Sequence, residues 1–211
     1  MCAPGDSEAN KALRQLVKFA QKRYFHLMIS EAIVDLVISE MINGFTGNDE
    51  YFSKTRDIFT ARLQNYIIET KKYLEAAIIG EIGNNTFDHN FVFEKGFPGG
   101  VYCNLSYKQE CVVLADFGMG IKRSLLSVLP EITSDLEAVE VAFTKRISGR
   151  SPEQRGNGLK FVSETIQHNN WHLYFQSGNG SCLIDKQQVK FIEKTPSITG
   201  CLAILNFSGE T

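Results

Sequence analysis

Near residue 90 the hydrophobic pattern of this 211-residue chain changes from the period of a helix to that of a strand. Before that point, apolar residues recur three and four positions apart, as they do on one face of a helix. After it, short runs rich in β-branched and aromatic residues are separated by glycines and polar turns. This order predicts an α/β fold, a two-layer sandwich in which a mixed, mostly antiparallel sheet is covered by helices on one face.

Three helical stretches are expected in the first 90 residues, over residues 6–28, 30–41 and about 53–89. The third is too long for one ordinary globular helix, so a break is predicted within residues 70–73. We expect the first two helices to bind a protein partner or to form a homodimer. The first half of the third stretch is expected to cover the domain that follows.

The chain after residue 100 predicts a sheet and one further helix. Val101–Tyr107 and Cys111–Asp116 are expected to form a hairpin, because only a short polar segment separates them. Turns are predicted at Gly178-Asn179-Gly180 and around Pro196. The other predicted elements are a helix over about 158–168 and strands over Trp171–Gln176, Ser181–Ile184, Val189–Ile192 and Cys201–Phe207.

The charge balance and the hydropathy pattern exclude several classes of partner. Lys and Arg number 22 and Asp and Glu number 24, so no basic field indicates nucleic acid or an anionic membrane. The longest apolar stretch, residues 29–42, contains three acidic residues and is shorter than the roughly 18 residues of a membrane span. Residues 1–11 contain no basic segment followed by an apolar one, so no secretory signal is expected.

The five cysteines are an odd number and are scattered along the chain, without a CxxC pair or a Cys/His cluster. This pattern indicates reduced thiols in a cytoplasmic protein, with four of the five in the core. A disulfide between Cys103 and Cys111 is the alternative interpretation.

The first motif that bears chemistry is a polar stripe on the helix that ends near residue 89. Glu81, Asn85, Asp88 and His89 stand at i, i+4, i+7 and i+8, so they share one helical face. The flanking residues are apolar, which predicts a buried helix, and a polar stripe on a buried helix needs partners or a ligand. Considered alone, the stripe is explained equally well by an exposed face or a helix C-terminal cap.

Two glycine motifs follow. An apolar strand ends at Asp116, and Gly118 and Gly120 come after it, where the backbone can turn or approach a ligand closely. Further on, Gly156-Asn157-Gly158 opens a helix, and the free N–H groups at a helix start suit a phosphate. Each motif alone is also typical of an ordinary turn or surface loop. The approach to the second motif is basic, with Lys145, Arg146, Arg150, Arg155 and Lys160.

Taken in order, the three motifs resemble those of the ATP-binding domain of the GHKL superfamily. That group includes DNA gyrase, heat-shock chaperones, mismatch-repair ATPases and histidine kinases. Glu81-x-x-x-Asn85 with His89 is similar to the N-box of the family. Asp116 to Gly120 looks like its first glycine box, and Gly156 to Leu159 looks like its second.

The resemblance covers about residues 71–207 and implies the Bergerat-type version of the two-layer sandwich. Residues 1–70 are then a helical N-terminal extension, and residues 71–211 form a GHKL-like ATP-binding domain. Near the C-terminus, many members of the family have Gly-Thr on a strand, and the Thr helps to bind adenine. Here Thr199-Gly200-Cys201 places a cysteine at that position, so the resemblance does not extend to this contact.

The resemblance also implies residue roles and two cofactors, ATP and Mg²⁺. Asn85 would coordinate Mg²⁺ through its side-chain oxygen, and Asp116 would accept a hydrogen bond from the adenine amino group. Asp88 would lie near the adenine side of the pocket, with a structural salt bridge as an equal alternative. Glu81 would orient or deprotonate the attacking nucleophile. The other nucleotide-binding residues implied are Gly118, Gly120, Ile121, Arg155, Gly156, Asn157, Gly158 and Leu159, with residues 121–155 as a mobile lid.

Two functions follow from the resemblance. The first is an ATPase or protein kinase component of a signalling or regulatory system. A complete histidine kinase is disfavoured, because His26 is not followed by the acidic, basic and proline residues of a phosphoacceptor helix. The alternative is a nucleotide-gated binding module with little or no hydrolysis, which recruits a protein partner through the N-terminal helices.

Overall fold

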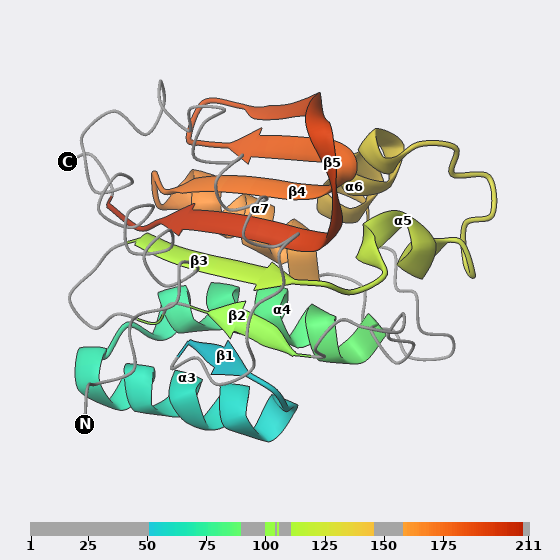
Figure 1. The fold of residues 1–211 in the computed structure, drawn as a ribbon. Coiled ribbons are helices and arrows are strands. Elements are labelled where there is room, and N and C mark those ends of the chain that lie inside the picture. Colours follow the sequence, from blue (N-terminus) through green and yellow to red (C-terminus); the bar gives the residue numbers. More distant parts are fainter. Residues whose placement is uncertain (1–50, 90–99, 104, 106–110, 146–157, 209–211) are drawn as a thin grey trace.

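The computed structural model describes residues 51–89, 100–103, 105, 111–145 and 158–208. The chain has an α/β fold in which a five-stranded open sheet packs against helices (Figure 1). This confirms the predicted class. Within the described residues every strand pairing is antiparallel, so that part of the sheet is not mixed. The predicted helices over residues 6–28 and 30–41 lie outside the described residues.

The strands lie in the order β1-β2-β3-β5-β4. The middle strand is β3, whose six residues are all buried, as a central strand of apolar residues requires. β3 pairs with β5 from Cys111 opposite Asn206 to Asp116 opposite Cys201. The strand bounds are β1 Phe52–Ser53, β2 Val101–Cys103, β3 Cys111–Asp116, β4 His172–Ile184 and β5 Val189–Asn206.

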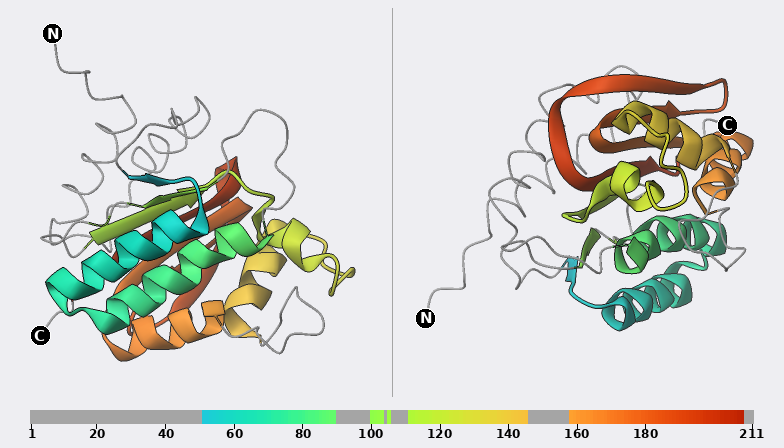
Figure 2. Two further views of the ribbon diagram at one scale, coloured as in Figure 1. Left: turned by 90° about the horizontal axis from the view of Figure 1, so that it is seen from below. Right: turned by 90° about the vertical axis from the view of Figure 1, so that its right-hand side faces the viewer.

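The larger helices cover one face of the sheet (Figure 2). The predicted break near residue 70 is confirmed, because Lys71 adopts a positive φ of 58° and ends one helix before the next begins. The helix predicted over about 158–168 is also confirmed. The helix bounds are α3 Arg56–Thr70, α4 Tyr73–His89, α5 Gly120–Leu125, α6 Asp135–Thr144 and α7 Gly158–His168. No helix in the described part of the chain is both long and apolar enough to cross a membrane.

Helix α3 packs against α4 and shares its core. Phe59 and Tyr66 are buried, and the ring of Phe59 lies on Gly83 of α4, where a Cβ would overlap it. The absent side chain therefore lets the two helices approach closely. Residues 56–70 cover the neighbouring helix, as expected, while the domain boundary at residue 70 stays a prediction.

The two turns predicted in the second half of the sheet were wrong. Gly178-Asn179-Gly180 lies inside β4, and Pro196 lies inside β5. Gly178 pairs with Ile198 but Gly180 pairs with Glu193, so the register shifts and the two strands bend together. Figure 2 shows this hairpin curling around α6. Glycine residues that favour a turn also suit a bulge, which is why the sequence pattern did not separate the two.

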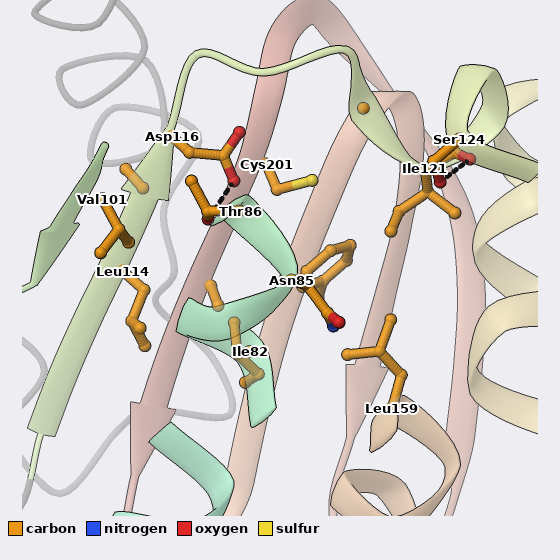
Figure 3. Close-up of a pocket in the computed structure, with 14 residues that line it drawn as sticks. Ile82, Asn85, Thr86, Val101, Leu114, Asp116, Ile121, Ser124, Leu159 and Cys201 are labelled. Atoms are coloured by element: carbon orange, nitrogen blue, oxygen red, sulfur yellow. Dashed lines mark hydrogen bonds between the residues drawn. The ribbon is translucent and has the colours of Figure 1, made fainter. Parts of the chain in front are cut away.

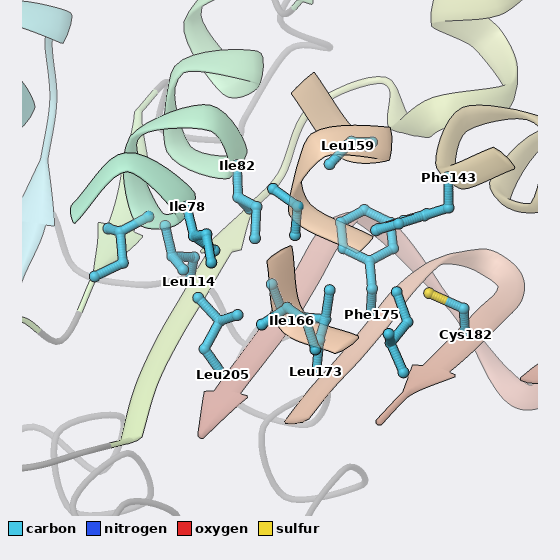
Figure 4. Close-up of a cluster of buried hydrophobic side chains, with 14 of the residues drawn as sticks. Ile78, Ile82, Leu114, Phe143, Leu159, Ile166, Leu173, Phe175, Cys182 and Leu205 are labelled. Atoms are coloured by element: carbon cyan, nitrogen blue, oxygen red, sulfur yellow. The ribbon is translucent and has the colours of Figure 1, made fainter. Parts of the chain in front are cut away.

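The core is continuous between the sheet and its helices (Figure 4). Cys103 and Cys182 are buried in it and Cys201 is partly buried against it; Cys111 is buried as well, and all four are free thiols. This agrees with the prediction of four reduced, core-facing cysteines and not with a Cys103–Cys111 disulfide.

The core thiols predict a loss of stability at alkaline pH. Burial raises the pKa of the Cys111 thiol from 9.0 to about 12, and it also raises those of Cys103 and Cys182. The folded state therefore keeps protons that the unfolded chain releases, and the free energy of unfolding is expected to fall as pH rises above about 9. For each such thiol the loss is about 1.4 kcal/mol per pH unit between its two pKa values.

Urea unfolding at about pH 8 and about pH 10 measures this dependence. A Cys111→Ala variant retains the other titrating groups, so its unfolding free energy should fall less steeply with pH than that of the parent protein. An equal slope in the two proteins would show that Cys111 is not one of the responsible groups.

Candidate functional site

A pocket lies where α4, α5 and α7 meet the sheet (Figure 3). Its cavity volume is about 30 Å³, within about 480 Å³ of space that includes open solvent, and most of its wall is apolar. An apolar wall with a few polar groups is typical of a small-molecule site. Its lining residues are Ile82, Asn85, Thr86, Val101, Leu114, Ala115, Asp116, Gly120, Ile121, Ser124, Leu159, Phe175, Cys201 and Ala203.

The pocket brings together residues from all three sequence motifs. Asn85 comes from α4, Asp116 from the end of β3, Gly120 and Ile121 from the start of α5, and Leu159 from the first turn of α7. These motifs are far apart in the sequence, and three different elements have to pack on one sheet for them to meet. In Figure 3 the Asn85 amide lies between Asp116 and Leu159.

Asp116 is the acidic residue among those that line this pocket. It is 7% exposed, and it ends β3 where the backbone leaves the sheet. Thr86 Oγ1 donates a hydrogen bond to its Oδ2 over 3.0 Å, and the Gly118 N–H donates to its Oδ1 over 2.7 Å. Two donors on two different oxygens hold the carboxylate in one orientation. A carboxylate offers about four acceptor sites, so it can hold several protein donors and also accept one from a ligand.

The first glycine motif is fixed from the neighbouring strands. Ser177 of β4 accepts a hydrogen bond from the Ile121 N–H over 2.9 Å and donates one to the Gly200 carbonyl over 3.1 Å. Gly120 has a φ of +73°, and a Cβ there would come 2.8 Å from Ser177 Oγ. The start of α5 is therefore tied to both long strands, and only glycine suits residue 120.

Cys201 lies beside Asp116 in the sheet and also lines the pocket. Burial and the neighbouring Asp116 carboxylate raise the pKa of its thiol well above the usual value, while a hydrogen bond with Ser177 acts in the opposite direction. The thiol is therefore protonated at neutral pH. A thiol is a weak hydrogen-bond donor, so this wall of the pocket is less polar than a hydroxyl would make it.

Glu81 lies at the start of α7, one helical turn before Asn85. A Cβ on Gly158 would overlap Glu81 Oε2 and would come 3.5 Å from its carboxyl carbon. The Glu81 side chain is exposed, and its negative charge is favourable beside the N–H groups of a helix start. The structure thus places the first residue of the N-box-like motif against the second glycine motif.

Other predicted site residues lie elsewhere or are not described. Asp88 forms an ion pair with Arg56 of α3 and is not among the residues lining the pocket, which favours the salt-bridge interpretation. Gly118 lines a second, more polar hollow with a cavity volume of about 260 Å³, which shares Gly120 with the pocket. Lys160 forms an ion pair with Glu164 on its own helix at 3.7 Å. Outside the described residues lie Arg146, Arg150, Arg155, Gly156 and Asn157.

Only part of the predicted lid lies in the described structure. α6 is not lid-like, because Ala138, Val139 and Phe143 are buried and Phe143 packs edge-on against Phe175 of β4, with ring centroids 5.1 Å apart. The prediction of a lid over all of residues 121–155 was therefore wrong for this helix. Residues 146–157 lie outside the described residues.

Sequence reasoning did not identify Thr86, Ser177 or Phe175 as part of the site. Thr86 follows Asn85 directly but does not share its helical face, so the polar stripe gave no signal for it. Ser177 and Phe175 lie two residues apart on β4, and no motif surrounds them in the sequence. Their place in the site follows only from the pairing of β4 with β5.

Acidic, histidine and cysteine side chains do not gather as a metal site in the described part of the chain, where no group of three or more was found. Asn85 could bind a hard cation through its amide oxygen, while the Asp116 carboxylate of the same pocket already accepts hydrogen bonds from Thr86 and Gly118. A single oxygen fits Mg²⁺ that is held mainly by phosphates and water.

No protein-family model matches this chain, and no curated protein matches it. Its function is therefore inferred from the pocket itself.

Proposed function

We propose that this protein is a Mg²⁺-dependent ATP-binding protein of the GHKL type, with a Bergerat-type sheet and helix arrangement. The observation that carries the proposal is the pocket that Asn85, Asp116, Gly120 and Leu159 share. Residues of three separate motifs, in the order that the family requires, line one pocket. The free thiols support a reducing compartment, so the cytoplasm is part of the proposal.

The residues that line the pocket suit an adenine base. Ile82, Leu114 and Phe175 offer apolar surface for the faces and edges of the ring. Asp116 accepts a hydrogen bond from the exocyclic amino group of adenine. Guanine has a carbonyl oxygen at the same position, which a carboxylate would repel, so adenine is the expected base.

The phosphates would lie toward Asn85 and the start of α7. Asn85 contributes its amide oxygen to the coordination of Mg²⁺, which neutralises phosphate charge when it is bound. Glu81, whose carboxylate lies against Gly158, is suitably placed to orient or deprotonate a nucleophile near the terminal phosphate. An ATPase would use water as that nucleophile, and a protein kinase would use a hydroxyl.

Calorimetric titration with ATP, ADP and GTP, each with and without Mg²⁺, tests the proposal. We expect ATP and ADP to bind, GTP to bind much more weakly, and Mg²⁺ to strengthen ATP binding. A protein that binds none of the adenine nucleotides would refute the proposed function. A phosphate-release assay and a protein-labelling assay then separate an ATPase or kinase from a nucleotide-gated switch, which would bind ATP without either product.

Two substitutions on α4 separate binding from chemistry. Asn85→Ala is expected to abolish Mg²⁺-dependent ATP binding, because it removes the amide oxygen. Glu81→Ala is expected to spare binding and to remove any turnover. Asn84→Ala is a matched control for the first, since Asn84 is adjacent but does not line the pocket. Unchanged turnover in Glu81→Ala would eliminate this residue as the catalytic group.

A further inference from the structure

The contact that singles out this pocket is the hydrogen bond between Thr86 and Asp116. Thr86 is 4% exposed and Asp116 is 7% exposed, so the bond is shielded from water. Its length is 3.0 Å, and it joins α4 to the end of β3 across 30 residues of sequence. An ionised carboxylate only accepts hydrogen bonds, so the Thr86 hydroxyl is the donor.

The Gly118 N–H, which is the second donor to Asp116, does not fix the orientation of the carboxylate by itself. The Gly118 N–H holds Oδ1 from a backbone only two residues away, and that bond alone would allow the carboxylate to rotate about it. Thr86 holds the other oxygen from the helical layer (Figure 3). With both oxygens held, the plane of the carboxylate is set relative to the pocket.

The sheet neighbour of Asp116 does not supply a strong donor. Cys201 is its partner in the β3–β5 register, and its thiol is a weak donor compared with a hydroxyl. A side-chain hydroxyl that donates to Asp116 comes from helix α4.

We propose that Thr86 is a positioning residue for base recognition: its hydroxyl sets the orientation of Asp116 and thereby the preference for adenine over guanine. This inference rests on the proposed function, since it concerns how the same pocket selects its base. Thr86 acts through Asp116 and takes no part in any chemical step. The hydroxyl is the essential group, because valine has nearly the same shape as threonine without it.

The test is calorimetric titration of Thr86→Val with ATP and with GTP. We expect affinity for ATP to fall about tenfold, the scale of one lost hydrogen bond to a charged group, and the ATP-over-GTP ratio to fall with it. Thr86→Ser retains a hydroxyl and is expected to restore most of both values. If the valine variant does not fold, Thr86→Cys replaces it in the same titrations, because a thiol is only a weak hydrogen-bond donor.

Thr165→Val is the matched control, because it removes a buried helical hydroxyl that does not line the pocket. A merely structural role for Thr86 would lower the melting temperature in both variants and leave the ATP-over-GTP ratio unchanged. An unchanged ratio in folded Thr86→Val or Thr86→Cys would overturn the inference. If the parent protein prefers ATP over GTP, an unchanged ratio in the variants leaves the proposed function intact. If the parent protein binds no adenine nucleotide, the proposed function itself fails.

Discussion

Replacing Gly200 by alanine is expected to lower the free energy of unfolding by about 3 kcal/mol or more and to eliminate nucleotide binding. Gly200 has a φ of +81°, a conformation that alanine rarely adopts. Its Cβ would come 2.7 Å from the Asp116 carbonyl carbon and 2.8 Å from the Gly118 nitrogen, and it would overlap the Asp116 carbonyl oxygen. These are backbone atoms, so no side-chain rotation relieves the overlap.

The same overlap explains why binding should be lost together with stability. Any shift of β5 away from β3 moves Asp116 and Gly118, which form the proposed base-recognition end of the pocket. Urea unfolding and ATP titration measure the two effects. Thr199→Ala is the control, because Thr199 is the exposed neighbour of Gly200 on the same strand. Parent-like stability in Gly200→Ala would show that the backbones of β3 and β5 are not in close contact at this point.

Gly180→Ala is expected to lower the free energy of unfolding by about 2 to 3 kcal/mol while leaving the pocket intact. The Cβ would come 2.6 Å from the Leu136 nitrogen and would overlap the carbonyl group of Asp135 at the start of α6. Since Gly180 lines neither the pocket nor the second hollow, the folded fraction should bind ATP as the parent protein does.

Thermal unfolding of Gly180→Ala, with Asn179→Ala as control, tests this contact. The Asn179 N–H donates to Asp135 Oδ2 over 3.1 Å, and that backbone donor remains in the alanine variant. The control should therefore lie close to the parent protein. Equal melting temperatures for all three proteins would contradict the close packing of the hairpin on α6.

Local patterns predicted the elements that local forces define. The break before Tyr73, the helix that begins at Gly158 and the strand that ends at Asp116 all have their signals within a few residues. The course of β4 and β5 was not predictable in the same way. The glycines at 178 and 180 permit either a turn or a bulge, and packing against Asp135 of α6 is what selects the bulge.

The candidate site likewise has residues that the local sequence predicts and contacts that it does not predict. The spacing of Glu81 and Asn85 on a helix, and the strand that ends at Asp116, were readable from residue order alone. The sequence gives no sign that Thr86 reaches Asp116, because that contact depends on how closely α4 crosses the end of β3. The pairing of Asp88 with Arg56 was equally hidden, since α3 had to be placed beside α4 first.

The position of β5 has a consequence for how the protein is made. Ribosomes produce β5 after all the other described strands, yet it lies between β3 and β4 in the sheet. A nascent chain that stops before Cys201 has β3, β4 and the first part of β5, but it lacks Cys201–Asn206, the part of β5 that joins β3 to β4. The pocket wall therefore closes only after synthesis passes residue 206, and until then the apolar edges of β3 and β4 are available to chaperones or to aggregation.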